Sequence, residues 1–257
     1  MKNLSILLFS IITLSFLSCS SDKNDDPVGD GTNKTLNKKP TGTSARDFLA
    51  ASTYNTLVIE LVYIDGFKPN ATSIQNLKTF LEDRLNKPNG INIIEKKIPA
   101  LNLAPYDNND LLVVEDTFRS VYNNQSVLTL YAFFADGGSV SDTNNSFVLG
   151  TAYQNTSFVI YENTIKNNSG GIGQPNRIDL ETVVMIHEMG HLLGLVDLGS
   201  TMQTPHIDNA HGKHCDNEDC LMFWQAETGD IFASLIGGNI PELDANCISD
   251  LQANGGK

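Results

Sequence analysis

The chain has 257 residues, 40% of them hydrophobic and 18% charged, which is enough for one domain with a sizeable core and too few for three. Its 17 basic and 30 acidic residues give a formal net charge of −13 at pH 7, which argues against a surface that binds nucleic acid through its phosphates. The four cysteines are too sparse to hold together a small disulfide-rich fold, so we expect a hydrophobic core to do so.

The N-terminus resembles a bacterial export signal followed by a lipid-attachment site. Lys2 precedes an apolar run over 4–17 that is shorter than a transmembrane helix and typical of a signal peptide. A small residue and Cys19 follow, as in a lipobox, whose cysteine is lipidated and becomes the mature N-terminus. The Ser/Asp-rich stretch 20–26 is similar to the surface-export signal of Bacteroidetes lipoproteins. We therefore expect a signal peptide over 1–18 and a surface-exposed outer-membrane lipoprotein that meets the membrane only through its anchor; an ordinary signal peptide with an incidental cysteine is the alternative.

Residues 19–43 are polar and contain almost nothing apolar to bury, which predicts a flexible tether. The folded domain is then expected over 44–257.

Strand and helix patterns alternate through this domain. Runs rich in β-branched and apolar residues predict strands at 54–64, 91–98, 127–135, 147–153 and 157–161. Apolar residues spaced three and four apart predict helices at 73–85, 110–122, 179–195 and 241–252. A strand-helix-strand-helix-strand start followed by a hairpin-like pair indicates an α/β (α+β) fold with a mixed sheet and helices packed against it.

The third of these helices carries a metal-binding pattern. His187, Glu188 and His191 form H-E-x-x-H, and because positions four apart share a helix face, both imidazoles can bind one zinc ion while Glu188 reaches a water beside it. Asp179 is the expected N-cap and Gly194 the expected stop. A glycine there permits the positive φ that turns the chain back under the metal.

The segment 183–222 resembles the signature of the metzincin clan of zinc peptidases. H-E-x-x-H-x-x-G is the start of that signature, and the later string H-C-x4-C-x-M, which runs from His214 to Met222, is similar to its archaemetzincin continuation after an insertion. The resemblance implies a twisted mixed five-stranded sheet with a backing helix, an active-site helix and a small C-terminal helical subdomain. It also implies one catalytic zinc bound by His187, His191 and His214, with Met222 forming the Met-turn beneath it.

The identity of the third ligand is open, because Asp197 stands where the signature has its third histidine. If the insertion loops out, His214 is the ligand, and its spacing to Met222 favours this choice. If the short turn is used, Asp197 is the ligand, as in the snapalysin-like pattern. A gluzincin with Glu242 as ligand is a further alternative, against which Gly194 and Met222 argue.

Cysteines and histidines near the third ligand raise a second question. In archaemetzincins the two cysteines of the string join a later C-x-x-C to hold a second zinc, whereas only Cys247 follows here. For an exported protein we expect a disulfide between Cys215 and Cys220, with a second zinc as the alternative, and Cys247 as a buried free thiol. For His206 and His211, an exposed polar loop and a second metal site both stay open.

The resemblance implies a zinc-dependent metalloendopeptidase, in which Glu188 takes a proton from the attacking zinc-activated water and delivers it to the leaving amine. We expect a protein or peptide substrate to bind in an extended form along the strand at 147–153, and the protein to be a monomer. The alternative is a surface lipoprotein that binds a peptide or glycan and uses zinc only structurally. Glu188 favours the enzyme, because a structural zinc site needs no general base.

Overall fold

The structure is a computed structural model that describes residues 33–144 and 146–257. The predicted signal peptide, the lipid attachment at Cys19 and most of the predicted tether lie outside the described residues. Within the described part of the chain, no helix combines the length and the apolar character needed to cross a membrane.

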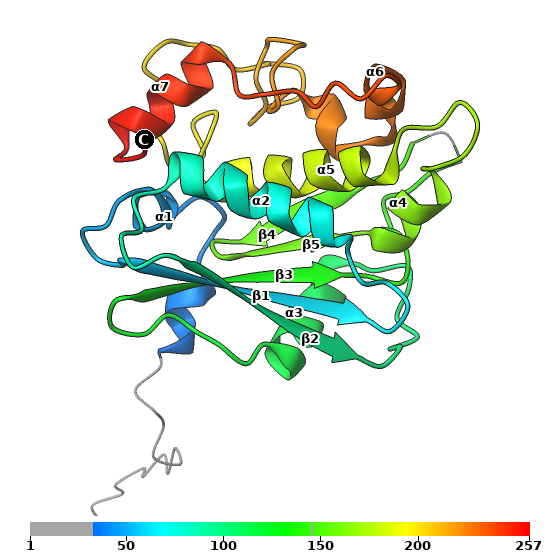
Figure 1. The fold of residues 1–257 in the computed structure, drawn as a ribbon, viewed down its shortest axis with the longest axis horizontal. Coiled ribbons are helices and arrows are strands. Elements are labelled where there is room, and N and C mark those ends of the chain that lie inside the picture. Colours follow the sequence, from blue (N-terminus) through cyan, green and yellow to red (C-terminus); the bar gives the residue numbers. More distant parts are fainter. Residues whose placement is uncertain (1–32, 145) are drawn as a thin grey trace, which may run out of the picture. The chain divides into compact units, whose positions relative to one another are not determined.

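A mixed sheet of five strands forms the centre of the fold, as predicted (Figure 1). In sheet order the strands are β2 (Ile91–Ile98), β1 (Thr56–Ile64), β3 (Val127–Phe134), β5 (Ser157–Ile160) and β4 (Gly150–Gln154). The first four are parallel, and β4 runs antiparallel to β5 at the edge of the sheet. The strand predicted from 147 begins later because Val148 pairs with Thr228 outside the sheet.

Helices cover both faces of this sheet. The helical segments of the described chain are η1 (Lys34–Asn37), α1 (Ala45–Leu49), α2 (Ala71–Arg84), α3 (Asn108–Phe118), α4 (Glu162–Asn167), α5 (Arg177–Leu192), η2 (Trp224–Glu227), η3 (Gly229–Ile231), α6 (Phe232–Leu235) and α7 (Ala245–Ala253). Helices α2 and α5 lie on one face and α3 lies on the other (Figure 1). Alternate residues of β1 enter the two cores, Leu57 and Ile59 on the α5 side and Val62 and Ile64 on the α3 side, so this strand is buried on both faces as predicted.

Side-chain caps place the helix starts earlier than the apolar spacing predicts. Asn70, Asp107 and Asn176 each accept a hydrogen bond from a main-chain N–H in the first turn of α2, α3 and α5. Asp179, the predicted N-cap, instead lies within the first turn of α5, where its negative charge suits the helix N-terminus. Gly194 follows the end of α5 with φ of +76°, which confirms the predicted turn.

Helix α5 lies between the sheet and the C-terminal segment that carries α6 and α7 (Figure 1). All residues of α5 from Leu180 to Leu192 are buried. The predicted site-bearing helix is therefore enclosed on two sides, and its polar residues need partners or a ligand within the protein.

The N-terminal part of the described chain corrects the predicted boundary at 43/44, because residues before 44 belong to the fold. Asn37 is completely buried, and its amide donates to side-chain oxygens of Asn123, Thr129 and Thr156 at 2.9, 3.2 and 3.0 Å. Lys39 exchanges main-chain and side-chain hydrogen bonds with Asn155. The polar residues that predicted a tether here instead form hydrogen bonds with polar groups of the folded domain, several of them buried.

Candidate metal centre

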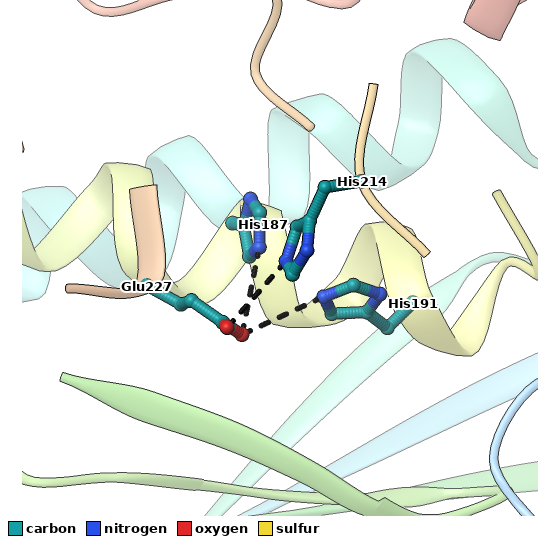
Figure 2. A group of neighbouring side chains, drawn as sticks. All are labelled: His187, His191, His214 and Glu227. Atoms are coloured by element: carbon teal, nitrogen blue, oxygen red, sulfur yellow. Dashed lines mark ion pairs between the residues drawn. The ribbon is translucent and has the colours of Figure 1, made fainter. Parts of the chain in front are cut away.

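Three histidines converge on the side of α5 that faces the C-terminal segment. His187 and His191 are one helical turn apart on α5, and His214 comes from the long loop that follows (Figure 2). The ring centroids of the three pairs lie 4.8, 5.3 and 5.1 Å apart, and all three residues are buried. The structure thus brings together the three residues that the sequence singles out.

Main-chain carbonyls orient two of these rings. His187 Nδ1 lies 2.7 Å from the Leu221 carbonyl oxygen, and His214 Nδ1 lies 2.7 Å from that of His211. Because a carbonyl oxygen only accepts, both Nδ1 atoms carry the proton and both Nε2 atoms keep a lone pair. Those two Nε2 atoms are buried and have no hydrogen-bond partner among the described residues. Buried imidazole nitrogens held in this way fit a metal ion, since ligating histidines commonly donate their other N–H to a carbonyl.

Burial keeps the helix histidines neutral, as metal ligands must be. Burial, together with the neighbouring His191, lowers the pKa of His187 to about 3. Burial also lowers the pKa of His191. Neither ring is therefore protonated near neutral pH, so no proton has to leave before a metal ion binds.

Glu188 faces a cavity between α5 and the edge strand. This cavity of about 200 Å³ is bordered by His191 and His214 and by Thr151 and Ala152 of β4. Glu188 is fully buried, and neither of its carboxylate oxygens has a hydrogen-bond partner among the described residues. Burial, with a smaller contribution from the charge of Glu227, raises the pKa of Glu188 well above its ordinary value.

Met222 packs against α5 at Gly190. Its side chain is completely buried and packs on Gly190, the residue between the two helix histidines. A Cβ atom at position 190 would lie 2.2 Å from Met222 Sδ, so the close approach of this methionine requires glycine there. Met222 therefore packs against the helix that carries two of the histidines, whereas Gly190 was not singled out because it occupies a variable position of H-E-x-x-H.

The two alternative ligands lie elsewhere. Asp197 is exposed, just beyond the turn at Gly194. Glu242 pairs through its main chain with Cys220. Neither belongs to a group of possible ligand atoms among the described residues.

Glu227, which sequence reasoning missed, completes the cluster. Its carboxylate oxygens lie 3.9, 3.7 and 3.5 Å from the Nε2 atoms of His187, His191 and His214 (Figure 2). Burial alone would raise the pKa of Glu227, but His191 and His214 more than offset this effect and lower it below the ordinary value. No spacing in the sequence marks Glu227, because it comes from a short 3-10 turn after Met222.

A second group of possible metal ligands consists of His206, Cys215, Asp244 and Cys247, and it includes two of the three cysteines of the described chain. All three cysteines are buried free thiols, which confirms the prediction for Cys247 and overturns the expected disulfide between Cys215 and Cys220. The Sγ atom of the α7 residue Cys247 lies 3.7 Å from Cys220 Sγ. His206 Nδ1 lies 3.3 Å from Cys215 Sγ and 4.0 Å from Cys247 Sγ.

The two loop histidines have different environments. His206 is buried, and its Nε2 lies 2.8 Å from an oxygen of the buried Asp250 on α7. His211 is exposed; its Nδ1 lies 2.6 Å from Asp208, and its ring stacks on Trp224 with centroids 4.3 Å apart. His206 therefore belongs to the thiol cluster and His211 to the polar loop surface.

No protein-family model matches this chain, and no curated protein sequence matches it. Among solved structures, it is similar to an archaemetzincin from Methanopyrus kandleri, at 16% identity and a TM-score of 0.48, over 78% of this chain and 96% of that one. It is also similar to metalloproteinase-II from Bacteroides fragilis, at 16% identity and a TM-score of 0.41, over 86% of this chain and 58% of that one. At these values the likenesses identify no family, and the function of the chain has to be argued from its site.

Proposed function

We propose that this protein is a zinc-dependent endopeptidase. One observation carries the proposal: three buried imidazoles converge beside a buried carboxylate, Glu188, that has no hydrogen-bond partner in the described chain and borders the same cavity. Three imidazole ligands suit zinc better than they suit calcium or magnesium, which prefer oxygen ligands. The ligands of the catalytic ion would be His187, His191 and His214.

The zinc ion, when bound, supplies a Lewis acid that polarises the scissile carbonyl and activates water. Glu188 takes a proton from the attacking water and delivers it to the leaving amine as the C–N bond breaks. Burial raises the pKa of Glu188, which favours the uptake of a proton from water. The carbonyls of Leu221 and His211 hold the His187 and His214 rings during the reaction.

The substrate would be a protein or peptide bound in extended form along β4. This strand is at the edge of the sheet, and its residues Thr151 and Ala152 border the cavity beside Glu188. An edge strand offers main-chain groups to which a peptide can pair. In the structure, the Thr41 hydroxyl donates to the Ala152 carbonyl at 3.2 Å, and a substrate N–H that pairs with this carbonyl would take the place of the hydroxyl.

The general base is the residue that tests the proposal. The change Glu188→Gln should leave the catalytic zinc ion bound. It should reduce the rate of cleavage of an unfolded protein substrate by at least about 100-fold, since general-base catalysis contributes factors of this size or more. Exposed Glu218→Gln is the matched control and should cleave at the rate of the unaltered protein. Full activity in Glu188→Gln would contradict the mechanism.

A second candidate is a surface protein that binds a peptide or glycan and uses zinc only structurally. Glu227 favours this candidate, because structural zinc sites have four protein ligands. The unpartnered Glu188 favours the enzyme, since a structural site gives a buried carboxylate no role. The second candidate would be supported if the unaltered protein and Glu188→Gln both retained zinc and neither cleaved peptides.

We also propose a second, structural zinc ion bound by His206, Cys215 and Cys247, with Cys220 or Asp244 as the fourth ligand. The Cys220–Cys247 Sγ distance of 3.7 Å fits two thiolates on one tetrahedral zinc, where bonds of about 2.3 Å place sulfurs roughly 3.8 Å apart. Asp250 would orient the His206 ring from behind. Elemental analysis should find two zinc ions per chain and one in Cys247→Ser; one ion in both would contradict the second site.

Export and anchoring are also proposals, supported by the N-terminal sequence alone. We propose that Cys19 carries lipid on an outer-membrane protein exposed at the cell surface, and that the folded domain is a monomer. Cys19→Ala should move the protein from the detergent phase to the aqueous phase in a Triton X-114 partition. A protein that partitions identically with and without Cys19 would exclude the anchor.

A further inference from the structure

We propose that Glu227 is a fourth protein ligand of the catalytic metal, so that the resting site is closed and must open before water can take part in the reaction. This inference rests on the proposed function only in requiring a metal ion at the three histidines. It assigns to Glu227 a role in both metal binding and latency.

The distances within the cluster distinguish a shared ion from direct hydrogen bonds. Imidazole and carboxylate groups that bond directly have N···O distances of about 2.7–3.2 Å. The three N···O distances from Glu227 are 3.5, 3.7 and 3.9 Å, and all four candidate ligand atoms lie within 4.8 Å of one another. Zinc–ligand bonds of about 2.0–2.2 Å place the corners of a tetrahedron roughly 3.3–3.6 Å apart, close to the observed separations. The carboxylate is thus held away from the rings at the spacing of a fourth ligand.

The burial of the cluster points the same way. His187 Nε2 and His214 Nε2 are buried and unpartnered, and neither lies closer than 3.5 Å to an oxygen of Glu227. A cation between the four groups would satisfy all of them at once. The Glu227 side chain is 30% exposed, which makes it the most accessible member of the cluster.

The position of Glu227 also joins it to the substrate strand. The Glu227 carbonyl accepts a hydrogen bond from Leu149 N–H at 2.8 Å, immediately before β4 begins at Gly150. The next residue, Thr228, pairs with Val148. Glu227 borders the same cavity as Glu188, so its carboxylate occupies the space in which water and the scissile bond would have to meet. Displacing this carboxylate would therefore accompany productive binding of substrate at β4.

Zinc affinity and inhibitor affinity test the inference without relying on turnover. In competition with a chelator, Glu227→Gln in the full chain should bind zinc at least about 10-fold more weakly than the unaltered protein, while Asp230→Asn, in the adjacent η3, should not differ. In the cobalt-substituted proteins, acetohydroxamate should bind Glu227→Gln more tightly than the unaltered protein. In the variant, the hydroxamate no longer has to displace the Glu227 carboxylate from the metal. The visible spectrum of cobalt reports that binding.

The outcomes separate this inference from the proposed function. If Glu227→Gln keeps both the zinc affinity and the hydroxamate affinity of the unaltered protein, Glu227 is not a ligand, while the peptidase proposal stands. If the unaltered protein binds zinc but His214→Ala binds it equally well, the three-histidine site is wrong and both proposals fail. A crystal of the zinc-loaded protein with a Glu227 oxygen within about 2.2 Å of the ion would confirm the fourth ligand directly.

Discussion

Single residues decide which atoms meet at the candidate metal centre. His214 and Asp197 were both possible third ligands, and only His214 lies against the two helix histidines. Its ring is buried and oriented by the His211 carbonyl, whereas Asp197 is exposed. The difference lies in where the loop after Gly194 returns to the helix.

This arrangement predicts opposite results for two alanine changes. His214→Ala should weaken zinc binding by at least roughly 100-fold, because changes behind a ligand already cost about 10–100-fold and this change removes one of three imidazole donors. Asp197→Ala should bind zinc as the unaltered protein does. The measurement is retained zinc after dialysis against a graded chelator. Loss of zinc in Asp197→Ala with retention in His214→Ala would favour the short-turn alternative.

At the scale of elements, α5 holds the site because it is packed on both sides. The sheet covers one side, and the C-terminal segment brings Leu221 and Met222 against the other. The contact of Met222 with Gly190 sets how closely this segment approaches the helix. The helix therefore supplies two histidines and also locates the third.

A double-mutant cycle tests that contact. Gly190→Ala should destabilise the protein by about 1–3 kcal/mol through overpacking, despite the higher helix propensity of alanine. Met222→Ala should cost about 2–5 kcal/mol through loss of buried volume. The double variant should lose less stability than the two single losses added together, by about 0.5–3 kcal/mol. The shortened side chain at position 222 makes room for the new methyl group at position 190. Urea unfolding of the metal-free proteins gives the free energies, and strict additivity would show that the two residues do not contact.

At the scale of the whole molecule, the fold begins before the predicted boundary. The segment 34–43 contributes the buried Asn37 and places Thr41 at the edge of β4. Its hydrogen bonds serve polar groups from 123–129 and 155–156, which are distant in sequence. We therefore expect this segment to stabilise the domain and not only to link it to an anchor.

Truncation tests this expectation. A chain that begins at residue 44 should unfold at lower temperature than one that begins at residue 33, because buried groups such as the Asn123 and Thr129 side chains lose their Asn37 partner. The thermal midpoint of each chain is the measurement. Equal thermal midpoints in the two chains would show that the stable domain begins near residue 44, as the sequence predicts.

The stability of the whole molecule should also depend on pH through a buried carboxyl group at the junction of α4 and α5. Glu162 is fully buried beside Arg177, and burial, followed by the neighbouring Glu181, raises the pKa of Glu162 to about 9. The folded state therefore retains a proton that the unfolded state loses near pH 4.5, so the free energy of unfolding should fall as pH rises from about 4.5 to about 9. Glu162→Gln removes this titration.

Denaturant unfolding at pH 5, 7 and 9 measures the effect. The unaltered protein should lose more stability between pH 5 and pH 9 than Glu162→Gln, which has no proton to release at that position. An equal loss in both proteins would show that Glu162 is ionised in the folded state.

The sequence by itself determined the features that depend on local spacing. Alternating and continuous apolar runs located the five strands, and three-and-four spacing located α2, α3 and α5 to within a few residues. The interval between His187 and His191 predicted their shared helix face, since neighbours four apart face the same way in any α-helix. His214 and Met222 were found through the resemblance of their string to a known signature.

Only the tertiary structure decided which distant residues join these. Glu227 reaches the histidines from a turn held by Leu149, and Cys247 joins Cys215 and Cys220 from the last helix. Asn37 fills a polar pocket that its own neighbourhood in the sequence does not reveal. These contacts depend on the path of loops and on the packing of α5 between two layers, and neither leaves a periodic signal, because a residue in a loop has no spacing rule that ties it to its partners.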